Sequence, residues 1–364
     1  MPLRYGGFAF LFSGWRPLYS VTISRIDSFS RLQVHEWIER TMLHRTIPSL
    51  LTLLVLAVVV RGADERGTAY DLRHVTIWSD GTRMAGDLYV PRDMKEGEKR
   101  AAVLFCAGTA GTKKGNGALY ATRFVKEGFV VLAFDYRGWG ESDCKLMMTE
   151  PMPKPDENGI ITVKAKPVRW QMDLADQTWD IRCAISFLAG EPCVDAQRIA
   201  LFGTSYGGGL VMTAGNDPRV KCIVAQVPGM GGGRGPAAVK YAYELAIKQA
   251  RGETEPVPIE TGKLAGKLAV YAQMRANPAK GIGTSPIEAA AKVTAPTSIL
   301  VAEKEELMSN DENGVRAFDI LQKNKVPSEF HVLPGIGHYG VYRESFADAT
   351  QLAATWFHKH LDRK

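Results

Sequence analysis

One serine in this chain lies in a setting that could make it a nucleophile. Ser205 stands between Gly203 and Gly207 in the spacing Gly-x-Ser-x-Gly. The apolar run 199–202 precedes the motif and the helix-forming stretch 208–212 follows it, so the sequence predicts a strand, a tight turn and a helix. Such a turn holds the serine hydroxyl above the edge of a sheet, and glycines leave the necessary room because they carry no Cβ. The pattern favours nucleophilic catalysis over a solvent-facing serine in an ordinary glycine-rich turn.

A serine nucleophile needs a base within hydrogen-bond reach. Of the seven histidines, His338 alone is expected in a loop just past the C-terminal end of a strand, in the stretch 334–340. Catalytic groups of parallel sheets collect at that edge. The order serine, acid, histidine along the chain also suits this position, so His338 is the predicted base.

The acid that orients the base is expected in the loop after the preceding strand. That loop contains Glu303, Glu305, Glu306 and Asp311. Glu303 is expected at the end of the strand and Asp311 near the start of the next helix. Glu305 is therefore the best-spaced candidate, with Glu306 second and Asp311 as a further alternative.

Acyl transfer also requires two N–H groups to bind the oxyanion of the tetrahedral intermediate. One is expected from Tyr206, which follows the nucleophile, and the other from the glycine-rich loop 107–111 after an earlier strand. Thr109 is the candidate in that loop. Its side chain is secondary because the backbone supplies the proton.

The elements that must position these groups alternate between strands and helices. Two runs of period two joined by Asp80-Gly81 predict an antiparallel hairpin between Tyr70 and Val90. The strands and helices that follow predict an α/β protein with a mostly parallel sheet and the hairpin at its antiparallel edge. Further strands are expected at 100–106, 129–134, 199–202, 221–227, 297–302 and 329–333, with the principal helices at 118–127, 170–189, 314–324 and near the C-terminus.

Two of the intervening stretches carry more specific expectations. The helix 170–189 is expected to place the side chains of Met172, Ala175, Trp179, Cys183 and Phe187 on one apolar face. The stretch 151–168 is rich in proline and polar residues and is expected to run over the surface.

Between residues 229 and 294 the alternation stops. A glycine-rich start and helical stretches at 237–251 and 263–275 predict a helical lid inserted into a core formed by 63–228 and 295–364. We expect the lid to lie over Ser205, with Tyr241 and Tyr271 binding the substrate. The alternative, in which these aromatic residues pack a small core of the insertion, stays open.

Residues 1–62 have the pattern of a leader. Met42–Arg45 is basic, and the apolar run 49–60 ends near Gly62. The run is shorter than the roughly 20 residues that cross a bilayer, so a secretory signal peptide is expected, with Met42 as the possible true start. This predicts a secreted or periplasmic protein, or a cytoplasmic one if the segment is not used. An uncleaved membrane anchor or a buried strand is the alternative.

Charge and composition limit the kinds of ligand and partner that the protein is expected to bind. The formal charge is +6, but residues 1–61 carry seven Arg against three acidic residues, which leaves about +2 for the remainder and gives no electrostatic footprint for nucleic acid. The five cysteines form no CxxC pair, and neither HExxH nor a dinucleotide fingerprint is present. We therefore expect no metal, no cofactor and a small-molecule substrate. The sequence does not specify the oligomeric state.

Several motifs together resemble one superfamily over residues 71–361. The chain is similar to the α/β-hydrolases, in particular to the dienelactone-hydrolase-like and Xaa-Pro-dipeptidyl-peptidase-like group that includes fungal polyketide-transferase-like hydrolases. Glu305 departs from the commoner Asp, and Cys106-Ala-Gly108 replaces the usual His-Gly. The motifs that carry the resemblance are Asp135–Ser142, Gly203–Gly207, Ser285–Ala289, Gly337–Tyr339 with Tyr342, and Trp356–Leu361.

The resemblance implies an α/β-hydrolase fold and a serine hydrolase that cleaves carboxylic esters through an acyl-enzyme. Three alternatives remain on the same residues. They are an Xaa-Pro-type peptidase, an acyltransferase, and a binding protein that has kept the fold without turnover.

Overall fold

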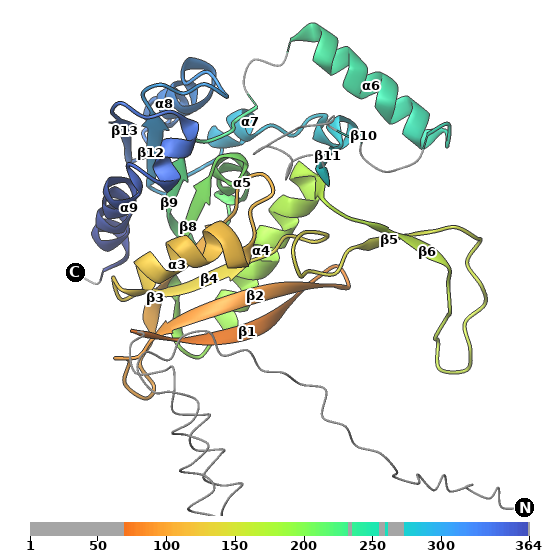
Figure 1. The fold of residues 1–364 in the computed structure, drawn as a ribbon, viewed down its shortest axis with the longest axis horizontal. Coiled ribbons are helices and arrows are strands. Elements are labelled where there is room, and N and C mark those ends of the chain that lie inside the picture. The colour runs from red at the N-terminus through yellow and green to blue at the C-terminus, as the bar shows by residue number, and fades with distance from the viewer. Residues whose placement is uncertain (1–68, 232–234, 255–258, 261–272, 363–364) are drawn as a thin grey trace, which may run out of the picture. The chain divides into compact units, whose positions relative to one another are not determined.

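The core of the molecule is one eight-stranded sheet (Figure 1), seen in a computed structural model that describes residues 69–231, 235–254, 259–260 and 273–362. The strand order is β1-β2-β4-β3-β8-β9-β12-β13. All neighbouring pairs from β4 to β13 are parallel, whereas β1 with β2 and β2 with β4 are antiparallel. The predicted parallel sheet with an antiparallel edge is therefore confirmed. Its strands are β1 (Tyr70–Ser79), β2 (Thr82–Pro91), β3 (Arg100–Cys106), β4 (Val130–Phe134), β8 (Val194–Thr204), β9 (Val220–Gln226), β12 (Thr297–Ala302) and β13 (Ser328–Leu333).

The hairpin at the edge turns at the two residues that predicted it. Asp80 and Gly81 both have positive φ, 45° and 75°, and Ser79 pairs with Thr82 across the turn. Two successive left-handed residues match the twist of the flanking strands. Asp and Gly tolerate this conformation better than other residues do.

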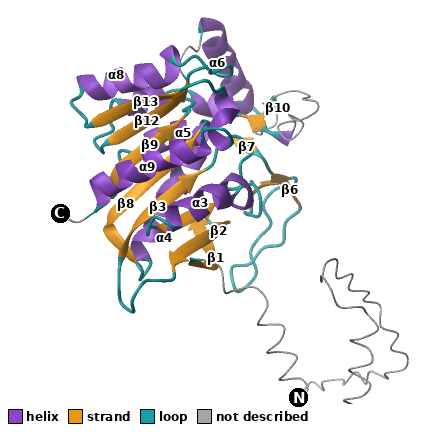
Figure 2. Cartoon of the chain, turned by 60° about the vertical axis from the view of Figure 1, so that its left-hand side comes forward, coloured by secondary structure: helices purple, strands orange, loops and turns teal. Residues whose placement is uncertain are grey.

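Helices cover both faces of the sheet (Figure 2). The helices α3 and α9 contact each other on one face, while α4 contacts α5, α5 contacts α7, and α7 contacts α8 on the other. The central strands β3, β4 and β12 are apolar and almost completely buried, as strands covered on both sides must be. The helices are α3 (Ala118–Val125), α4 (Leu174–Gly190), α5 (Tyr206–Ala214), α7 (Pro286–Ala290), α8 (Arg316–Lys323) and α9 (Phe346–Leu361).

The buried face of α4 differs from the predicted one. Ile181, Ala184, Ile185 and Leu188 are fully buried, whereas Trp179 is 45% exposed. The buried residues have the spacing i, i+3, i+4, i+7 and form the apolar stripe. Two polar residues, Gln177 and Asp180, also lie on the inner face, and both are hydrogen-bonded there. The predicted face was right only in part. Met172, Cys183 and Phe187 are partly buried against the core, whereas Ala175 and Trp179 are exposed.

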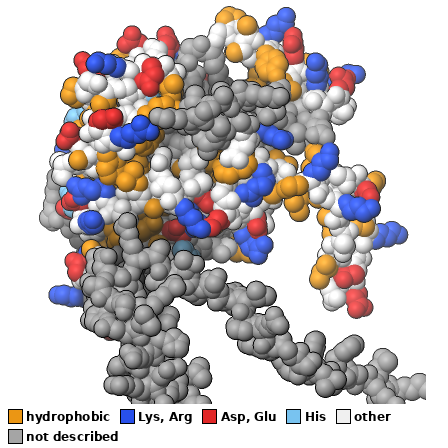
Figure 3. All heavy atoms as spheres, viewed as in Figure 1, with side chains coloured by type: hydrophobic (Ala, Val, Ile, Leu, Met, Phe, Trp, Pro, Cys, Tyr) orange, Lys and Arg blue, Asp and Glu red, His pale blue; other side chains and the backbone are white. Residues whose placement is uncertain are grey.

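The excursion around residues 151–168 is more ordered than the sequence predicted. Its two ends, β5 (Lys145–Met148) and β6 (Ala165–Val168), pair as a two-stranded antiparallel ribbon, and the ribbon with its connecting loop projects from the body (Figure 1). Charged side chains of both signs are interspersed on the face drawn in Figure 3, including the projecting arm. Leu146, Met152 and Ile160 are each more than 60% exposed.

The insertion contributes one long helix, α6 (Pro236–Ala250), and two short strands, β10 (Ile259–Glu260) and β11 (Arg275–Ala276). β11 pairs with β10 and, in parallel, with β7 (Gln171–Met172) just before α4. Most of the second predicted helix, and Tyr271 with it, lies outside the described residues.

The leader 1–62 also lies outside the described residues, so the signal peptide stays a prediction. In the part of the chain that the structure describes, no helix combines the length and apolar character needed to cross a membrane.

Candidate active site

Ser205 occupies the sharp turn between β8 and α5. Its backbone has φ 55° and ψ −121°, a conformation that residues other than glycine rarely adopt. Ser205 N–H donates to the Gln226 carbonyl at 2.9 Å and fixes the turn to β9. A Cβ on Gly203 would lie 2.2 Å from the Gly207 carbonyl oxygen, and one on Gly207 would lie 2.2 Å from the Cys106 carbonyl oxygen. Both motif glycines are thus required by close backbone contacts.

Three side chains from separate loops meet at this turn. His338 Nε2 lies 3.0 Å from Ser205 Oγ. On the other side of the imidazole ring, His338 Nδ1 lies 2.9 Å from Glu305 Oε2 and 3.0 Å from Oε1. The His338 and Glu305 side chains are each only 3% exposed. The structure therefore brings Ser205, His338 and Glu305 together at the carboxyl ends of β8, β12 and β13.

The other acidic residues of the loop lie elsewhere. Glu306 Oε2 accepts the backbone N–H of His338 at 2.7 Å, and Glu303 Oε2 accepts the backbone N–H of Gly335 at 2.6 Å. Asp311 begins the short helix η4 (Asp311–Val315) and is exposed. Glu303 and Glu306 thus brace the backbone of the histidine loop, while Glu305 contacts the imidazole. Sequence reasoning missed this division of labour because spacing does not show which backbone groups a carboxylate will meet.

The proposed oxyanion loop runs beside the nucleophile. A Cβ built on Gly108 would lie 3.1 Å from Ser205 Cβ and 2.9 Å from the Thr204 carbonyl oxygen, so only glycine allows this approach. Thr109 follows at the rim of the cavity that contains Ser205. Tyr206 is the first residue of α5, and the first backbone N–H groups of a helix have no acceptor within the helix. The placement of Thr109 and Tyr206 suits the two predicted donors.

A buried network holds the serine and histidine loops together. Thr204 Oγ1 lies 2.7 Å from the Tyr342 hydroxyl, and Tyr342 belongs to the turn η5 (His338–Tyr342) that begins with the histidine. Gln226 Nε2 donates to Thr204 Oγ1 and to the Tyr120 hydroxyl. Burial raises the pKa of Tyr342 to about 12, so its hydroxyl stays protonated at neutral pH. Sequence reasoning quoted Tyr342 only as part of a motif and gave it no role.

A cavity of about 580 Å³ opens above Ser205. Arg343 is its single charged lining residue apart from the histidine, among the residues that the structure describes. The Arg343 side chain is exposed and has no ion pair with a described acidic residue. No carboxylate lines this cavity in the described chain, so its charge favours neutral or anionic substrates. The lining is formed by Gly108, Thr109, Asn116, Leu119, Ser205, Leu307, His338, Tyr339, Tyr342 and Arg343.

The remaining candidates have no place at this cavity. Tyr241 lies on α6 with 47% of its surface exposed, and it does not line the cavity.

Cys106 is fully buried, and burial raises the pKa of its thiol far above the usual range, so it is no competing nucleophile. Across the described ranges, no cluster of three or more His, Cys, Asp or Glu side chains is placed to hold a metal ion.

A mostly parallel sheet with this strand order and a serine on a strained turn between a strand and a helix define an α/β-hydrolase. The chain therefore has the α/β-hydrolase fold. Residues 80–237 match the profile of the X-Pro dipeptidyl-peptidase (S15) family. This confirms the resemblance that the motifs indicated.

Individual relatives agree with this placement. An Escherichia coli protein encoded in the traX-finO intergenic region is 27% identical over 72% of this chain and 92% of its own length. The thiohydrolase apmlB of Arthrinium phaeospermum is 31% identical over 42% of this chain and 40% of its own. The α/β-hydrolase GrgF of Penicillium superposes with a TM-score of 0.63 at 18% identity, covering 80% of this chain and 99% of GrgF. Together the comparisons support a hydrolase of the serine type.

Proposed function

We propose that this protein is a serine hydrolase that cleaves carboxylic esters through an acyl-enzyme. The observation that carries the proposal is the continuous chain of contacts from Ser205 Oγ through the His338 ring to Glu305, at 3.0 Å and 2.9 Å. A base held in one tautomer and hydrogen-bonded to a serine hydroxyl is the arrangement that activates serine for acyl transfer.

In the proposed reaction, Ser205 Oγ attacks the ester carbonyl carbon and its proton moves to His338 Nε2. Glu305 stabilises the imidazolium that forms. The backbone N–H groups of Thr109 and Tyr206 bind the oxyanion, and His338 gives its proton to the departing alcohol. A water molecule, deprotonated by His338, then releases the acid and restores the serine.

An X-Pro dipeptidyl peptidase activity is the second candidate, because the family profile favours it. Such a substrate presents a free amino terminus, whose positive charge needs an anion nearby. The described lining of the cavity at Ser205 offers Arg343 instead of a carboxylate. This charge supports esters over dipeptidyl substrates. Thioesters, the substrates implied by the name of the thiohydrolase relative, pass through the same acyl-enzyme.

We still propose that the insertion acts as a lid, although Tyr241 does not line the cavity at Ser205. Its helix α6 lies over a separate cavity that Tyr206 also lines. Tyr271 stays a candidate on sequence grounds alone.

The experiment uses a fluorophosphonate probe, followed by a substrate panel. We expect the probe to label the wild type and not Ser205→Ala, and 4-nitrophenyl acetate to be hydrolysed at least tenfold faster than Ala-Pro-4-nitroanilide. Folded wild-type protein that resists labelling would support a binding protein instead. A faster reaction with the anilide would support the peptidase.

A further inference from the structure

The proposed nucleophile and base come from strands that are not neighbours in the sheet. Ser205 follows β8 and His338 follows β13, and the strands β9 and β12 lie between them (Figure 2). Neighbouring strands are about 4.8 Å apart, so these two strand ends are separated by roughly 14 Å. The turn η5 must therefore reach back across two strands to bring His338 Nε2 within 3.0 Å of Ser205 Oγ. Hydrogen bonds between neighbouring strands cannot fix this distance.

A second contact joins the same two turns. Thr204 Oγ1 lies 2.7 Å from the Tyr342 hydroxyl. Thr204 directly precedes the nucleophile, and Tyr342 is the last residue of the turn that begins with His338. The bond therefore ties the backbone beside Ser205 to the backbone that carries the histidine.

The surroundings hold this bond in one place. Thr204 and Gln226 are fully buried. Gln226, at the end of β9, accepts the Ser205 N–H with its carbonyl at 2.9 Å, and its Nε2 donates to Thr204 Oγ1 at 3.0 Å and to the Tyr120 hydroxyl at 2.6 Å. The Tyr120 ring, from α3, meets the Tyr342 ring edge-on with centroids 6.3 Å apart. Buried polar networks of this kind make a site rigid, so the two hydroxyls are positioned before any substrate binds.

Proton transfer from serine to histidine depends closely on the distance between them. A displacement of about 1 Å can lower the rate of a reaction by roughly 100-fold, and hydrogen bonds behind the reacting side chains provide the necessary accuracy. We propose that Thr204 and Tyr342 are positioning residues, whose mutual hydrogen bond sets the distance between Ser205 Oγ and His338 Nε2. The inference rests on the proposed serine hydrolase mechanism and adds two residues that act through the serine and the histidine.

The first test is Thr204→Val, which keeps the shape of the side chain and removes its hydroxyl. We expect kcat for 4-nitrophenyl acetate to fall roughly 10- to 100-fold with KM unchanged, and fluorophosphonate labelling of Ser205 to slow by a similar factor. Thr204→Ser keeps the hydroxyl and should react at close to the wild-type rate. A wild-type kcat in folded Thr204→Val would overturn the proposal.

Tyr342→Phe breaks the same bond from the other side and serves as the second variant. Tyr342 also lines the cavity at Ser205, whereas Thr204 is not among the described lining residues. A loss through substrate contact would therefore raise KM in Tyr342→Phe alone. We expect both variants to lose kcat by similar factors, and the double variant to lose little more than either, because the two changes remove one shared interaction. Losses that multiply in the double variant, or a change confined to KM, would contradict the proposal.

Tyr89→Phe is the matched control for the loss of a buried hydroxyl. Tyr89 is also buried, but it lies on β2, which β4 and β3 separate from β8. We expect its kcat to equal that of the wild type, whatever happens to the urea midpoint. A loss of kcat as large as that in Tyr342→Phe would overturn the assignment. If the wild type hydrolyses no ester and takes no fluorophosphonate label, the proposed function fails instead, so the two failures are distinguishable.

Discussion

Two buried carboxylates in this protein are held in opposite ways. Asp180, which is fully buried, accepts from Arg137 Nε at 2.7 Å and from the Ser79 hydroxyl at 2.8 Å. Glu305 is almost as buried, but among the described residues it accepts only the backbone N–H of Leu307 and contacts the imidazole of His338. Asp180 therefore has a permanent counterion, whereas in the proposed mechanism Glu305 gains one only when His338 takes a proton.

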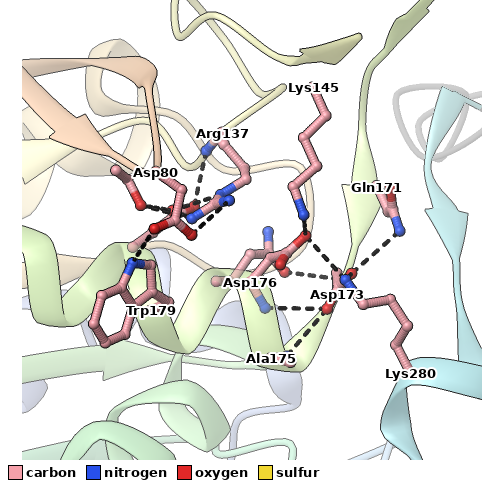
Figure 4. A network of polar contacts seen from close by, with 12 residues as sticks. Asp80, Arg137, Lys145, Gln171, Asp173, Ala175, Asp176, Trp179 and Lys280 are labelled. Atoms are coloured by element: carbon pink, nitrogen blue, oxygen red, sulfur yellow. Dashed lines mark hydrogen bonds and ion pairs between the residues drawn. The ribbon is translucent and has the colours of Figure 1, made fainter. Parts of the chain in front are cut away.

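The difference separates stability from catalysis. The Arg137 guanidinium ties the turn of the β1–β2 hairpin to α4, and Figure 4 shows it beside Asp80 and Trp179. Its pairing with Asp180 is already made in the resting protein, although Arg137 Nη1 makes no hydrogen bond with a described residue. The interaction of Glu305 with His338 becomes strongest in the transition state, and only interactions of that kind accelerate the chemical step. Substitutions of the two carboxylates should therefore produce opposite phenotypes.

The largest expected effect is that of Glu305→Gln on turnover. Removing the charge leaves the imidazolium without its stabilising partner, so kcat should fall roughly 10³–10⁴-fold while the unfolding midpoint changes little. Glu306→Gln is the matched control, because its amide oxygen can still accept the His338 backbone N–H. Steady-state kinetics on both variants test this. Equal, small losses would move the orienting role away from Glu305.

Asp180→Asn should have the reverse phenotype. The change leaves the buried Arg137 guanidinium with only the exposed Asp80, at 3.6 Å, as a counterion. The free energy of unfolding should therefore fall by up to about 3 kcal/mol. Glu312→Gln, which removes one member of an exposed pair with Arg316 at 3.5 Å, should cost about 1 kcal/mol or less. Urea denaturation measures the free energy of unfolding of both variants. The rate of fluorophosphonate labelling shows whether the folded variants keep a reactive serine. A slow labelling rate in stably folded Asp180→Asn would erase the contrast between the two regions.

A third group of buried side chains sharpens the comparison, because these side chains have no counterion and stay neutral. Burial raises the pKa of Tyr89 and of Tyr342 to about 12, against about 10 in an unfolded chain. Between these values the unfolded chain releases protons that the folded protein keeps. The stabilisation is therefore complete below pH 10 and is lost as the pH rises toward 12.

Each of these two tyrosines should then lower the free energy of unfolding by about 1.4 kcal/mol per pH unit in that window. Urea midpoints at pH 8, 10 and 11 measure the slope. Tyr342→Phe should make the decline shallower. An identical decline in wild type and variant would show that Tyr342 does not contribute.

Much of the fold was predictable because its signals are local. The Asp80-Gly81 turn, the apolar strands and the two motif glycines each follow from a short stretch of sequence. The meeting of Ser205 with His338 and Glu305 was foreseeable from topology, since groups after parallel strands gather at one edge. The roles of these residues stay a proposal.

The features that sequence reasoning missed depend on partners distant in the chain. Asp180 is buried because Arg137 and Ser79 meet it there, which the spacing of apolar residues on α4 cannot show. The ribbon of β5 and β6 was missed because its pairing joins residues about twenty positions apart, across a proline-rich loop.

The left-handed backbone at Ser205 has a consequence for how this chain can evolve. Strained backbone positions persist only where the surroundings impose them, and glycine adopts such a conformation at lower cost than serine does. While the reaction is under selection, the need for the hydroxyl keeps serine at this strained position. A descendant that lost its reaction would have no reason to keep serine there, and drift toward glycine would relieve the strain. The residue at position 205 in diverged descendants would therefore record whether a lineage still depends on catalysis.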